Sequence, residues 1–318
     1  GTLSKAEFLG LDGKPAPGAT LENCAELRMA YDDHGNLTEG ACIGVDGKPA
    51  LGPFGYSVQQ REIDQRGNMV QVSYLGLDGK PTISREGFAK ITYAYDGQNR
   101  EVERAFYGLD GMRTLFIDPS AMTDGYAGIR LAYNDRGNLV ERSYFGLDTK
   151  PILSRERIAK ITYAYDALGR EIGRAFYDAH DRPTLGISGY ASIARQFDAR
   201  GNEIENAFFG LDGKPVQAGA GHAKVLYSYD TLGRETDARY FDAQGRQLAV
   251  DVVIAGVIPN TTAARLGFAP GDRVIDYDGR KPTSVRQFTH AVADASGHQL
   301  RRLVLHRGPD DLTFEVAP

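Results

Sequence analysis

The sequence predicts a mainly β fold: an array of about seven 32-residue β-hairpin repeats, forming a twisted ribbon or solenoid, followed by a small α+β domain at the C-terminus. Three observations lead to this prediction. An Asp–x–x–Gly turn, usually preceded by an aromatic residue, recurs through residues 1–246. The segments that flank each turn are rich in Ile, Tyr, Thr and Phe, and the period stops at residue 247, where another pattern begins. A fixed period of this size indicates a stacked array of units.

The Asp of each turn, or the Asn that replaces it once, serves as a marker residue for its copy. Successive markers are 32, 32, 38, 32, 32 and 32 residues apart. Because the steps are so regular, a residue that looks functional on its own is first interpreted as a member of a repeat column. The markers are Asp32, Asp64, Asp96, Asn134, Asp166, Asp198 and Asp230.

Residues 154–183 show one unit clearly. Two runs flank Asp166–Arg170, and their residue types favour a pleated, half-buried surface. The Asp and Gly of the turn supply an Asx hydrogen bond and a residue that tolerates positive φ, so the segment is predicted to be a β-hairpin. A second turn, Gly-Leu-Asp-Gly-Lys-Pro or a variant, closes each unit, which gives the order strand, turn, strand, turn.

Two usually aromatic columns lie almost symmetrically about each turn, eight residues before the marker and ten after it. We infer a cross-strand pair between them, which stabilises a hairpin by about 0.2–1 kcal/mol relative to an Ala pair. A bulge at the turn would shift this register by one residue. The predicted pairs are Cys24 with Cys42, Tyr56 with Tyr74, Phe88 with Phe106, Tyr126 with Tyr144, Ile158 with Phe176, Tyr190 with Phe208, and His222 with Tyr240.

The chain has two cysteines, Cys24 and Cys42, and they occupy both halves of this pair in the first copy. One interpretation is a disulfide across the hairpin, which is typical of an oxidising compartment. The other is a pair of small buried thiols that fill the aromatic slot. On the first interpretation an extracytoplasmic location, periplasmic or secreted, is favoured over the cytoplasm, and the sequence leaves the compartment open.

The array departs from its period in two places. Copy four carries six extra residues within Phe116–Asp124. An insertion in an array maps to a surface loop, either on a binding face or as a neutral variation. The array also begins in mid-unit, since Phe8 and Asp12 match the second strand and closing turn of a copy. We therefore expect the chain to be part of a longer protein, with an open sheet edge at its first strand.

The turn sequences resemble the tyrosine–aspartate (YD) repeats of the RHS type. The resemblance covers about residues 1–246, although the period here is longer than the usual YD unit. It implies a continuous β ribbon, which in that family coils into a shell around cargo; seven copies are too few for a closed shell, so an open, twisted ribbon is expected. The residues that carry it are Tyr95-Asp96, Tyr165-Asp166 with Gly169-Arg170, and Tyr229-Asp230 with Gly233-Arg234.

Residues 247–318 follow a different pattern of short apolar segments and turns. Continuous apolar runs indicate core strands, capping residues and Gly267 delimit a short helix, and an apolar stripe indicates a longer helix. The expected elements are a strand at Val250–Ile258, a helix at Thr261–Leu266, a strand at Arg273–Tyr277, a helix at Ser284–Ala295, and strands at Leu300–Arg307 and Leu312–Val316.

The run Pro259–Ile275, with Asp278-Gly279 after it, resembles the core of a bacterial PDZ domain of the HtrA type. The resemblance covers residues 247–318 and implies that an extended peptide, often a C-terminus, binds between a strand and a helix by β-augmentation. The usual carboxylate-binding loop would fall at the end of the array; alternatively, the last ribbon strand fills the groove and the module only caps the array. The predicted peptide-binding residues are Gly245, Arg246, Leu248, Val250, Val252, Val285, Thr289 and Val292.

Composition and motifs argue against several classes of function. The net charge is −5 and no basic stripe occurs, which argues against nucleic acid as a partner. No apolar run is long enough for a membrane-spanning helix, so no membrane insertion by this chain is expected. The six histidines show no metal-ligand spacing, so no metal or cofactor is expected. No motif brings together a nucleophile, a base and an orienting group, so this chain is not expected to be an enzyme.

The leading hypothesis is a non-catalytic protein-recognition or scaffolding fragment of a larger bacterial protein. Its expected partner is a protein or peptide, which the PDZ-like domain reads unless that domain only caps the array; the PDZ resemblance implies regulation of an upstream protease or effector. A second hypothesis is a structural repeat protein that binds a glycan or a protein with its Tyr-rich ribbon. A third is an enzyme whose active site forms only in three dimensions.

Overall fold

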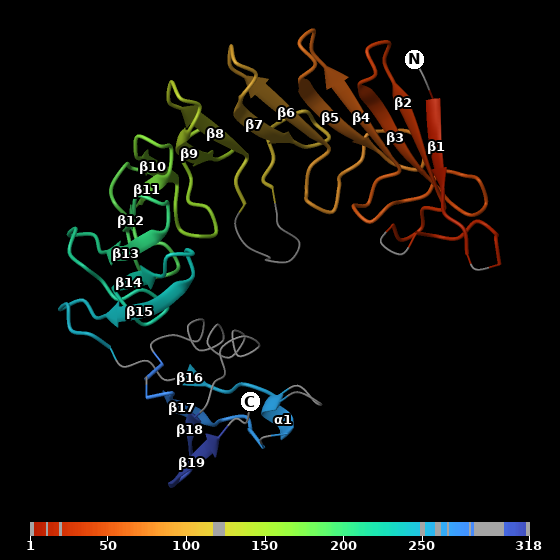
Figure 1. Ribbon diagram of the computed structural model, residues 1–318. Helices are drawn as coiled ribbons and strands as arrows, with labels where there is room; N and C mark the ends of the chain where they lie inside the picture. Colours follow the sequence, from red (N-terminus) through yellow and green to blue (C-terminus); the bar gives the residue numbers. More distant parts are fainter. Residues whose placement is uncertain are drawn as a thin grey trace. The chain divides into compact units, whose positions relative to one another are not determined.

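The computed structural model describes residues 3–10, 12–18, 21–116, 125–248, 252–257, 262–265, 267–279, 281–282 and 302–315 (Figure 1). Within them the chain forms a 15-stranded sheet and a 4-stranded sheet, with one short α-helix. The chain divides into two compact units, residues 1–170 with 175–186, and residues 171–174 with 187–318. The change of sheet falls between residues 241 and 252. A domain boundary at residues 246/247 stays a prediction.

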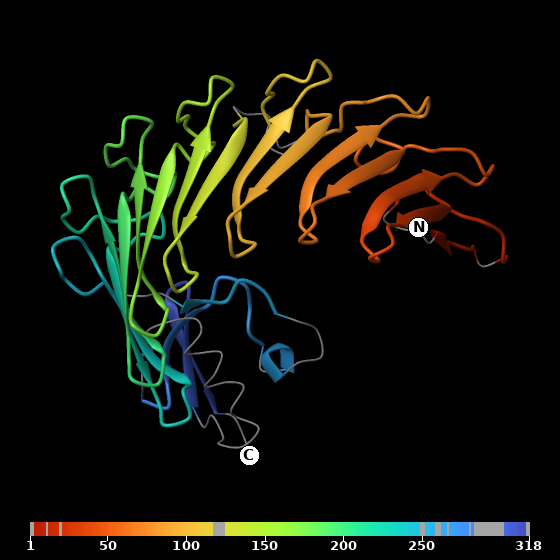
Figure 2. The same cartoon turned by 90° about the horizontal axis from the view of Figure 1, so that it is seen from above.

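The strands of the large sheet follow one another in sequence order, each hydrogen-bonded to the next (Figure 2). Each complete copy contributes a strand of 6 residues before the marker turn and one of 7 residues after it. This confirms the predicted array of β-hairpins. The strands are β1 (Leu3–Glu7), β2 (Glu26–Tyr31), β3 (Leu37–Ile43), β4 (Val58–Ile63), β5 (Met69–Leu75), β6 (Lys90–Tyr95), β7 (Glu101–Tyr107), β8 (Gly128–Tyr133), β9 (Leu139–Phe145), β10 (Lys160–Tyr165), β11 (Glu171–Tyr177), β12 (Ser192–Phe197), β13 (Glu203–Phe209), β14 (Lys224–Tyr229) and β15 (Glu235–Phe241).

The marker residue holds each hairpin turn together. In the turn between β6 and β7, Oδ1 of Asp96 accepts hydrogen bonds from the backbone N–H groups of Gln98 (2.8 Å) and Arg100 (3.0 Å). The Arg100 side chain donates from Nε to Oδ2 of the same carboxylate, at 2.6 Å. Asn99 has a φ of 60°, at the position where all six other copies have glycine. The marker carboxylate is therefore a structural group that satisfies the donors of its own turn.

The register within the hairpins differs from the predicted one. Phe106 in β7 pairs with Ile91 of β6 and not with Phe88, and a register shift lies beside the marker turn. Phe88 precedes β6 and closes a third turn, in which the N–H of Ser84 donates to the Phe88 carbonyl (2.8 Å). The predicted cross-strand pairing is therefore wrong. The two aromatic columns nevertheless meet, because this third turn places the Phe88 ring centroid 4.9 Å from that of Phe106.

Rings from these two columns form the core of the array, which we call the aromatic ladder. Successive ring centroids are 4.4 to 6.0 Å apart in the first unit and 4.8 to 5.7 Å apart in the second. Most of the ring pairs are tilted, which is one of the arrangements that the quadrupole of an aromatic ring favours. The ladder consists of Tyr56, Tyr74, Phe88, Phe106, Tyr126 and Tyr144 in the first unit, and of Tyr190, Phe208, His222 and Tyr240 in the second.

The tyrosine of the Tyr-Asp signature ties one copy to the next. The Tyr95 hydroxyl donates to the carbonyl of Met69, the first residue of β5 in the preceding copy, at 2.8 Å. These hydroxyls are therefore engaged in holding the array together. The same bond, also 2.8 Å, joins Tyr165 to Leu139 and Tyr229 to Glu203.

The insertion in copy four lengthens the third turn. The N–H of Phe116 donates to the carbonyl of Tyr126 (2.9 Å), as in the other third turns, so the six extra residues lie between these two ends. Residues 117–124 lie outside the described part of the chain. The Phe116 ring packs against the rings of Phe88, Phe106 and Tyr126, with centroids 5.4 to 6.1 Å apart. The segment predicted to be a surface loop thus begins with a ring of the core.

The second sheet has the strand order β16-β17-β18-β19. The expected strand at Arg273–Tyr277 is confirmed, whereas the first strand is far shorter than the apolar run at Val250–Ile258. The helix expected at Ser284–Ala295 lies outside the described residues, and the PDZ assignment stays a prediction. The elements are β16 (Val252–Val253), α1 (Thr262–Arg265), β17 (Arg273–Tyr277), β18 (Arg302–Arg307) and β19 (Asp310–Glu315), around a core of Val252, Val274, Tyr277, Leu303 and Leu305.

A buried carboxylate fixes the turn that leads into β17. Asp272 is 1% exposed, and its oxygens accept hydrogen bonds from Nε of Arg307 (2.6 Å) and from the N–H of Ala269 (2.8 Å). The bond from Arg307 is the main reason that the pKa of Asp272 lies below its ordinary value. Asp272 is therefore charged at neutral pH and joins this turn to β18.

Candidate functional site

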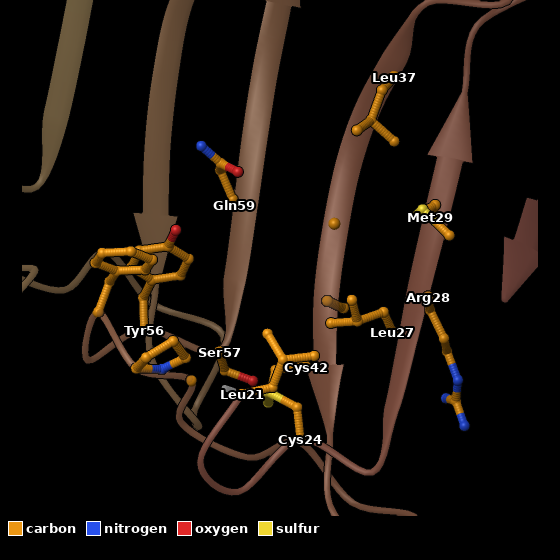
Figure 3. A pocket seen from close by; sticks show the side chains of 15 residues that line it. Leu21, Cys24, Leu27, Arg28, Met29, Leu37, Cys42, Tyr56, Ser57 and Gln59 are labelled. Carbon is orange, nitrogen blue, oxygen red and sulfur yellow. A yellow bond between two sulfur atoms is a disulfide. The ribbon is translucent and has the colours of Figure 1, made fainter. Parts of the chain in front are cut away.

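A pocket of about 250 Å³ opens within the first two hairpins of the array (Figure 3). The third turn before β2, strands β2 and β3, the third turn before β4 and the start of β4 supply its lining. Its walls are mostly apolar, which is the usual character of a ligand pocket. The lining includes the side chains of Leu27, Met29, Leu37, Tyr56 and Ser57, and it also includes Gly40.

The pocket exists because the first copy lacks bulk that other copies have in the same place. Gly40 stands in the column that holds Val72 and Arg104 in the next two copies. A Cβ atom added at Gly40 would meet no other atom within 4 Å. Cys24 and Cys42 stand where the aromatic ladder would place two rings. Smaller side chains on an unchanged backbone leave the pocket open.

Cys24 and Cys42 form a disulfide in the wall of the pocket, with their Cα atoms 5.2 Å apart. Cys24 lies in the third turn before β2, whereas Cys42 lies in β3 and pairs in the sheet with Leu27. Both cysteines are buried. The bond therefore joins a turn to a strand, and a covalent link takes the place of the ring contact found in other copies.

Ser57 places a buried hydroxyl against the pocket. Its residue is 1% exposed, and the hydroxyl has no hydrogen-bond partner within the described part of the chain. The backbone is satisfied, because its N–H donates to the Leu75 carbonyl and its own carbonyl accepts the N–H of Cys42, both at 2.8 Å. The fold does not require this hydroxyl, since the same column holds alanine in the six other copies: Ala25, Ala89, Ala127, Ala159, Ala191 and Ala223.

The sequence reasoning missed Ser57 and Gly40, although their signal is present in the repeat columns. Ser57 breaks a column that is otherwise entirely alanine, and Gly40 is the smallest residue of its column. Comparing each column for its one exception, in addition to its common residue, would have found both. Such a comparison identifies the positions at which one copy has a residue that the packing of the other copies does not require.

Unlike the Ser57 hydroxyl, the Arg28 and Gln59 side chains at the pocket have hydrogen-bond partners. Nε of Arg28 donates to Oε1 of Glu26 at 2.5 Å, and Oε1 of Gln59 accepts a hydrogen bond from the Arg61 side chain at 3.1 Å. Burial raises the pKa of Tyr56, so its hydroxyl stays neutral at physiological pH. The lining that the structure describes contains no His, Asp or Glu to activate the Ser57 hydroxyl as a nucleophile. The apolar lining suits the binding of a ligand.

The residues predicted to bind a peptide separate into three groups. Val250, Val285, Thr289 and Val292 lie outside the described residues. Val252 is 2% exposed and belongs to the core of the second sheet, so its side chain faces other residues of that core. Gly245, Arg246 and Leu248 belong to the closing turn of the last repeat copy and its exit: Gly245 has a φ of 77°, and the N–H of Leu248 donates to the Tyr240 carbonyl at 2.7 Å.

The turn around Gly245 already holds a carboxylate of its own. Oδ1 of Asp242 accepts the N–H groups of Gln244 (3.0 Å) and Arg246 (2.8 Å), and the Arg246 side chain donates to Oδ2 (2.7 Å). The N–H of Gly245 donates to the Asp242 carbonyl at 3.0 Å. The amides that the resemblance would offer to a peptide carboxylate are thus engaged within the turn, and the closing turn at Asp178 has the same arrangement.

Comparisons with known proteins do not assign a family. No family model and no curated protein matches the chain. Among solved structures, the chain is similar to TcdB2–TccC3 (13% identity over 92% of this chain and 12% of that one, TM-score 0.32) and to the same protein without its hypervariable C-terminal region (13%, 92%, 14%, TM-score 0.37). It is also similar to the Photorhabdus luminescens Tc holotoxin pore (12%, 74%, 13%, TM-score 0.26). The chain thus spans at most 14% of these proteins. The hairpin architecture stands on the register of the chain's own strands.

No group of three or more His, Cys, Asp or Glu side chains among the described residues is placed to hold a metal ion. No helix within the described ranges is long and apolar enough to cross a bilayer. The expectations that the chain needs no cofactor and is not an enzyme stay predictions.

Proposed function

We propose that this chain is a non-catalytic scaffold for protein recognition, in which the hairpin array is a spacer and the C-terminal sheet reads an extended peptide. The observation that carries the first part is the repeated joint between copies: main-chain pairing, a ring contact and a Tyr hydroxyl bond such as that of Tyr95. In a repeat protein, stability and stiffness come from such nearest-neighbour interfaces. A spacer of this kind holds whatever it carries at a defined distance.

The edge strand β16 supports the second part. Among the described residues, its one hydrogen-bonded neighbour is β17, and Val253 is 45% exposed. An extended peptide that adds to such an edge gains main-chain hydrogen bonds. The opposite edge, β19, carries Asp310, Asp311 and Glu315, and charges on an edge strand oppose further pairing. The C-terminal sheet therefore offers β16 as its docking edge.

The mode of binding that we propose is main-chain pairing without capture of a terminal carboxylate at the Gly245 turn. The amides of Gln244, Gly245 and Arg246 all donate to Asp242 and are therefore engaged within the turn. We therefore expect that converting a peptide's terminal carboxylate to an amide changes its Kd by less than about threefold, a free-energy difference under about 0.7 kcal/mol. Regulation of a protease or effector within a longer protein belongs to this proposal and follows only from the PDZ resemblance.

A peptide-display screen on the whole chain tests the proposal, followed by titration calorimetry with the selected peptides. Thr289→Arg, on the predicted helix side of the groove, is expected to weaken peptide binding by about tenfold or more. A tenfold increase in Kd corresponds to a loss of only about 1.4 kcal/mol of binding free energy. Thr231→Arg, in an exposed turn of the array, is the matched control and is expected to have no effect. A screen that selects no peptide, or a Thr289→Arg protein that binds as well as the parent, would contradict the peptide-reading role.

A Tyr-rich binding face, the alternative function, gains no support from the signature tyrosines. The hydroxyls of Tyr95, Tyr165 and Tyr229 bond to neighbouring copies. These side chains are committed to packing and offer little to a glycan. A glycan array probed with the whole chain addresses this alternative directly.

A further inference from the structure

We propose that the pocket in the first two hairpins is a binding site for one uncharged aromatic ring that carries a hydrogen-bonding oxygen, a ligand of the phenol class. This site is separate from the spacer and peptide-reading roles. It stands on the size of the pocket, on the place where the aromatic ladder ends, and on the buried Ser57 hydroxyl.

The size and lining of the pocket fit a single ring. An apolar cavity of about 150 Å³ in a protein core accepts benzene. The present pocket, at about 250 Å³, has room for a ring with one or two small substituents. Leu27, Met29 and Leu37 supply apolar walls, and the space over Gly40 stays free because this residue has no side chain. A ring that enters this space loses its contact with water where it meets the apolar walls.

The aromatic ladder ends at this pocket. The Tyr56 ring stacks on Tyr74 with centroids 4.4 Å apart and on Phe54, also in the pocket lining, with centroids 6.3 Å apart; the next two places of the ladder hold Cys24 and Cys42. Figure 3 shows Tyr56, Ser57 and the disulfide at one end of the pocket, with Leu37 and Gln59 toward the other. A ligand ring in the pocket would meet the rings of Phe54 and Tyr56 and would take the place of the ladder rings that the first copy lacks, with the tilted or offset contact that rings prefer.

Ser57 gives the site its polar specificity. A buried hydroxyl without a partner is unfavourable, and a ligand oxygen would supply that partner. A serine hydroxyl is one donor and two acceptors, and a phenol is both as well, so the two groups pair in either direction. Arg28 is bound to Glu26, so a charged ligand would find no free counter-charge at this wall. The chemistry therefore favours a neutral phenol over a carboxylate or an amine.

The test is titration of the intact, oxidised chain with p-cresol and with toluene, which is the same ring and methyl group without the oxygen. We expect p-cresol to bind about tenfold more tightly than toluene, the difference that one good hydrogen bond makes. Ser57→Ala restores the alanine of the other copies, so it should fold, and should lower the p-cresol affinity to that of toluene while leaving toluene unchanged. Ser73→Ala, in β5 and outside the pocket lining, is the matched control and should change neither.

Gly40→Leu places a side chain in the pocket and is expected to abolish the binding of both ligands. Circular dichroism verifies that this variant is folded. If it is not folded, the Ser57→Ala variant provides the test. If N-acetyl-tyrosinamide displaces bound p-cresol, the ligand's ring is assigned to a tyrosine side chain of a peptide. If it does not, the ring is assigned to a free phenol. The proposal is overturned if p-cresol does not bind, or if it binds the Ser57→Ala protein as tightly as the parent.

Discussion

The first and third hairpins of the array have the same backbone and different interiors. In both, a marker aspartate closes the turn and the register shifts at the same place beside it. The third hairpin fills its interior with Phe88 and Phe106, whereas the first has a disulfide and an open pocket. The turn and the strand pairing thus determine the backbone, and the interior can vary. Where one copy has a different residue from all the others, the shared backbone fold does not explain that residue.

The largest expected effect comes from opening a pocket in the filled hairpin. Phe88 is 1% exposed and contacts Tyr74, Phe106 and Phe116. Phe88→Ala is expected to lower the free energy of unfolding by about 3–5 kcal/mol, measured by urea denaturation. Leu109→Ala, at a 59% exposed position of the same copy, is the control and should change stability by less than about 0.5 kcal/mol. A loss below about 1 kcal/mol would mean that the ladder is not the core.

Removing the covalent link tests how the first hairpin compensates for its missing rings. The disulfide closes a segment with a sequence separation of 18 residues. A double Cys24→Ala, Cys42→Ala variant is expected to lose about 3 kcal/mol, because the unfolded chain regains the freedom of that loop. Reduction of the parent protein should produce the same shift in the urea midpoint. Equal midpoints for the oxidised and reduced proteins would show that the bond does not support this hairpin.

Exchanging Ser57 and its counterpart in the next copy tests the alanine column in both directions. Ala89→Ser buries a hydroxyl without a partner in a 4% exposed position and is expected to cost about 1–3 kcal/mol. Ser57→Ala removes such a hydroxyl and is expected to raise stability by about 1 kcal/mol. Both changes can be measured as shifts in melting temperature. If Ser57→Ala destabilises the ligand-free protein, the hydroxyl has a structural partner after all.

A smaller effect is expected from giving the first hairpin the residue that its neighbour has. Gly40 lies within β3, and the equivalent residue of the next copy is Val72. Gly40→Val is expected to raise the free energy of unfolding by about 0.5–1 kcal/mol, because glycine in a strand loses more conformational freedom on folding. The reciprocal Val72→Gly, at a 2% exposed site, should destabilise the protein. Destabilisation by Gly40→Val would show that the floor of the pocket is not open.

Acid should weaken the two hairpins alike, because both depend on the same kind of turn. Hydrogen bonds to the carboxylates, from Asn36 to Asp32 and from the backbone N–H of Arg100 to Asp96, lower the pKa of these aspartates. In the closing turn at Asp178, the backbone N–H of Arg182 lowers the pKa to about 2. Since these values lie below the unfolded value of about 3.9, the stabilisation is present above about pH 4 and is lost as the pH falls toward about 2.

Melting temperatures at pH 7, 4, 3 and 2 measure this dependence. The expected curve is flat down to about pH 4 and falls below it. Asp178→Asn, which keeps one acceptor oxygen and loses the charge, should make the fall shallower. A melting temperature that rises below about pH 4 would contradict the structural role of the turn carboxylates.

The sequence predicted the hairpins and the marker turns because both depend on neighbouring residues. An aspartate two and four residues before the amides that it accepts is visible in the sequence, and so is a glycine at positive φ. The third turn escaped prediction, although a glycine such as Gly87 with a φ of 90° precedes the ring there. Without that turn, the two aromatic columns were assigned to paired strands. The contact between the two aromatic columns was predicted, but the third turn that brings their rings together was not.

By itself, the sequence determined the period, the mainly β fold and the columns in which rings, small residues and turn formers recur, because each follows from the spacing of residues along the chain. The tertiary structure alone decided the register, the joining of Cys24 to Cys42 and the open space over Gly40. The physical reason is that a side chain's surroundings depend on which strands and turns meet around it. Ser57 is one residue in a column of alanines until the fold surrounds it with apolar walls and leaves its hydroxyl without a partner.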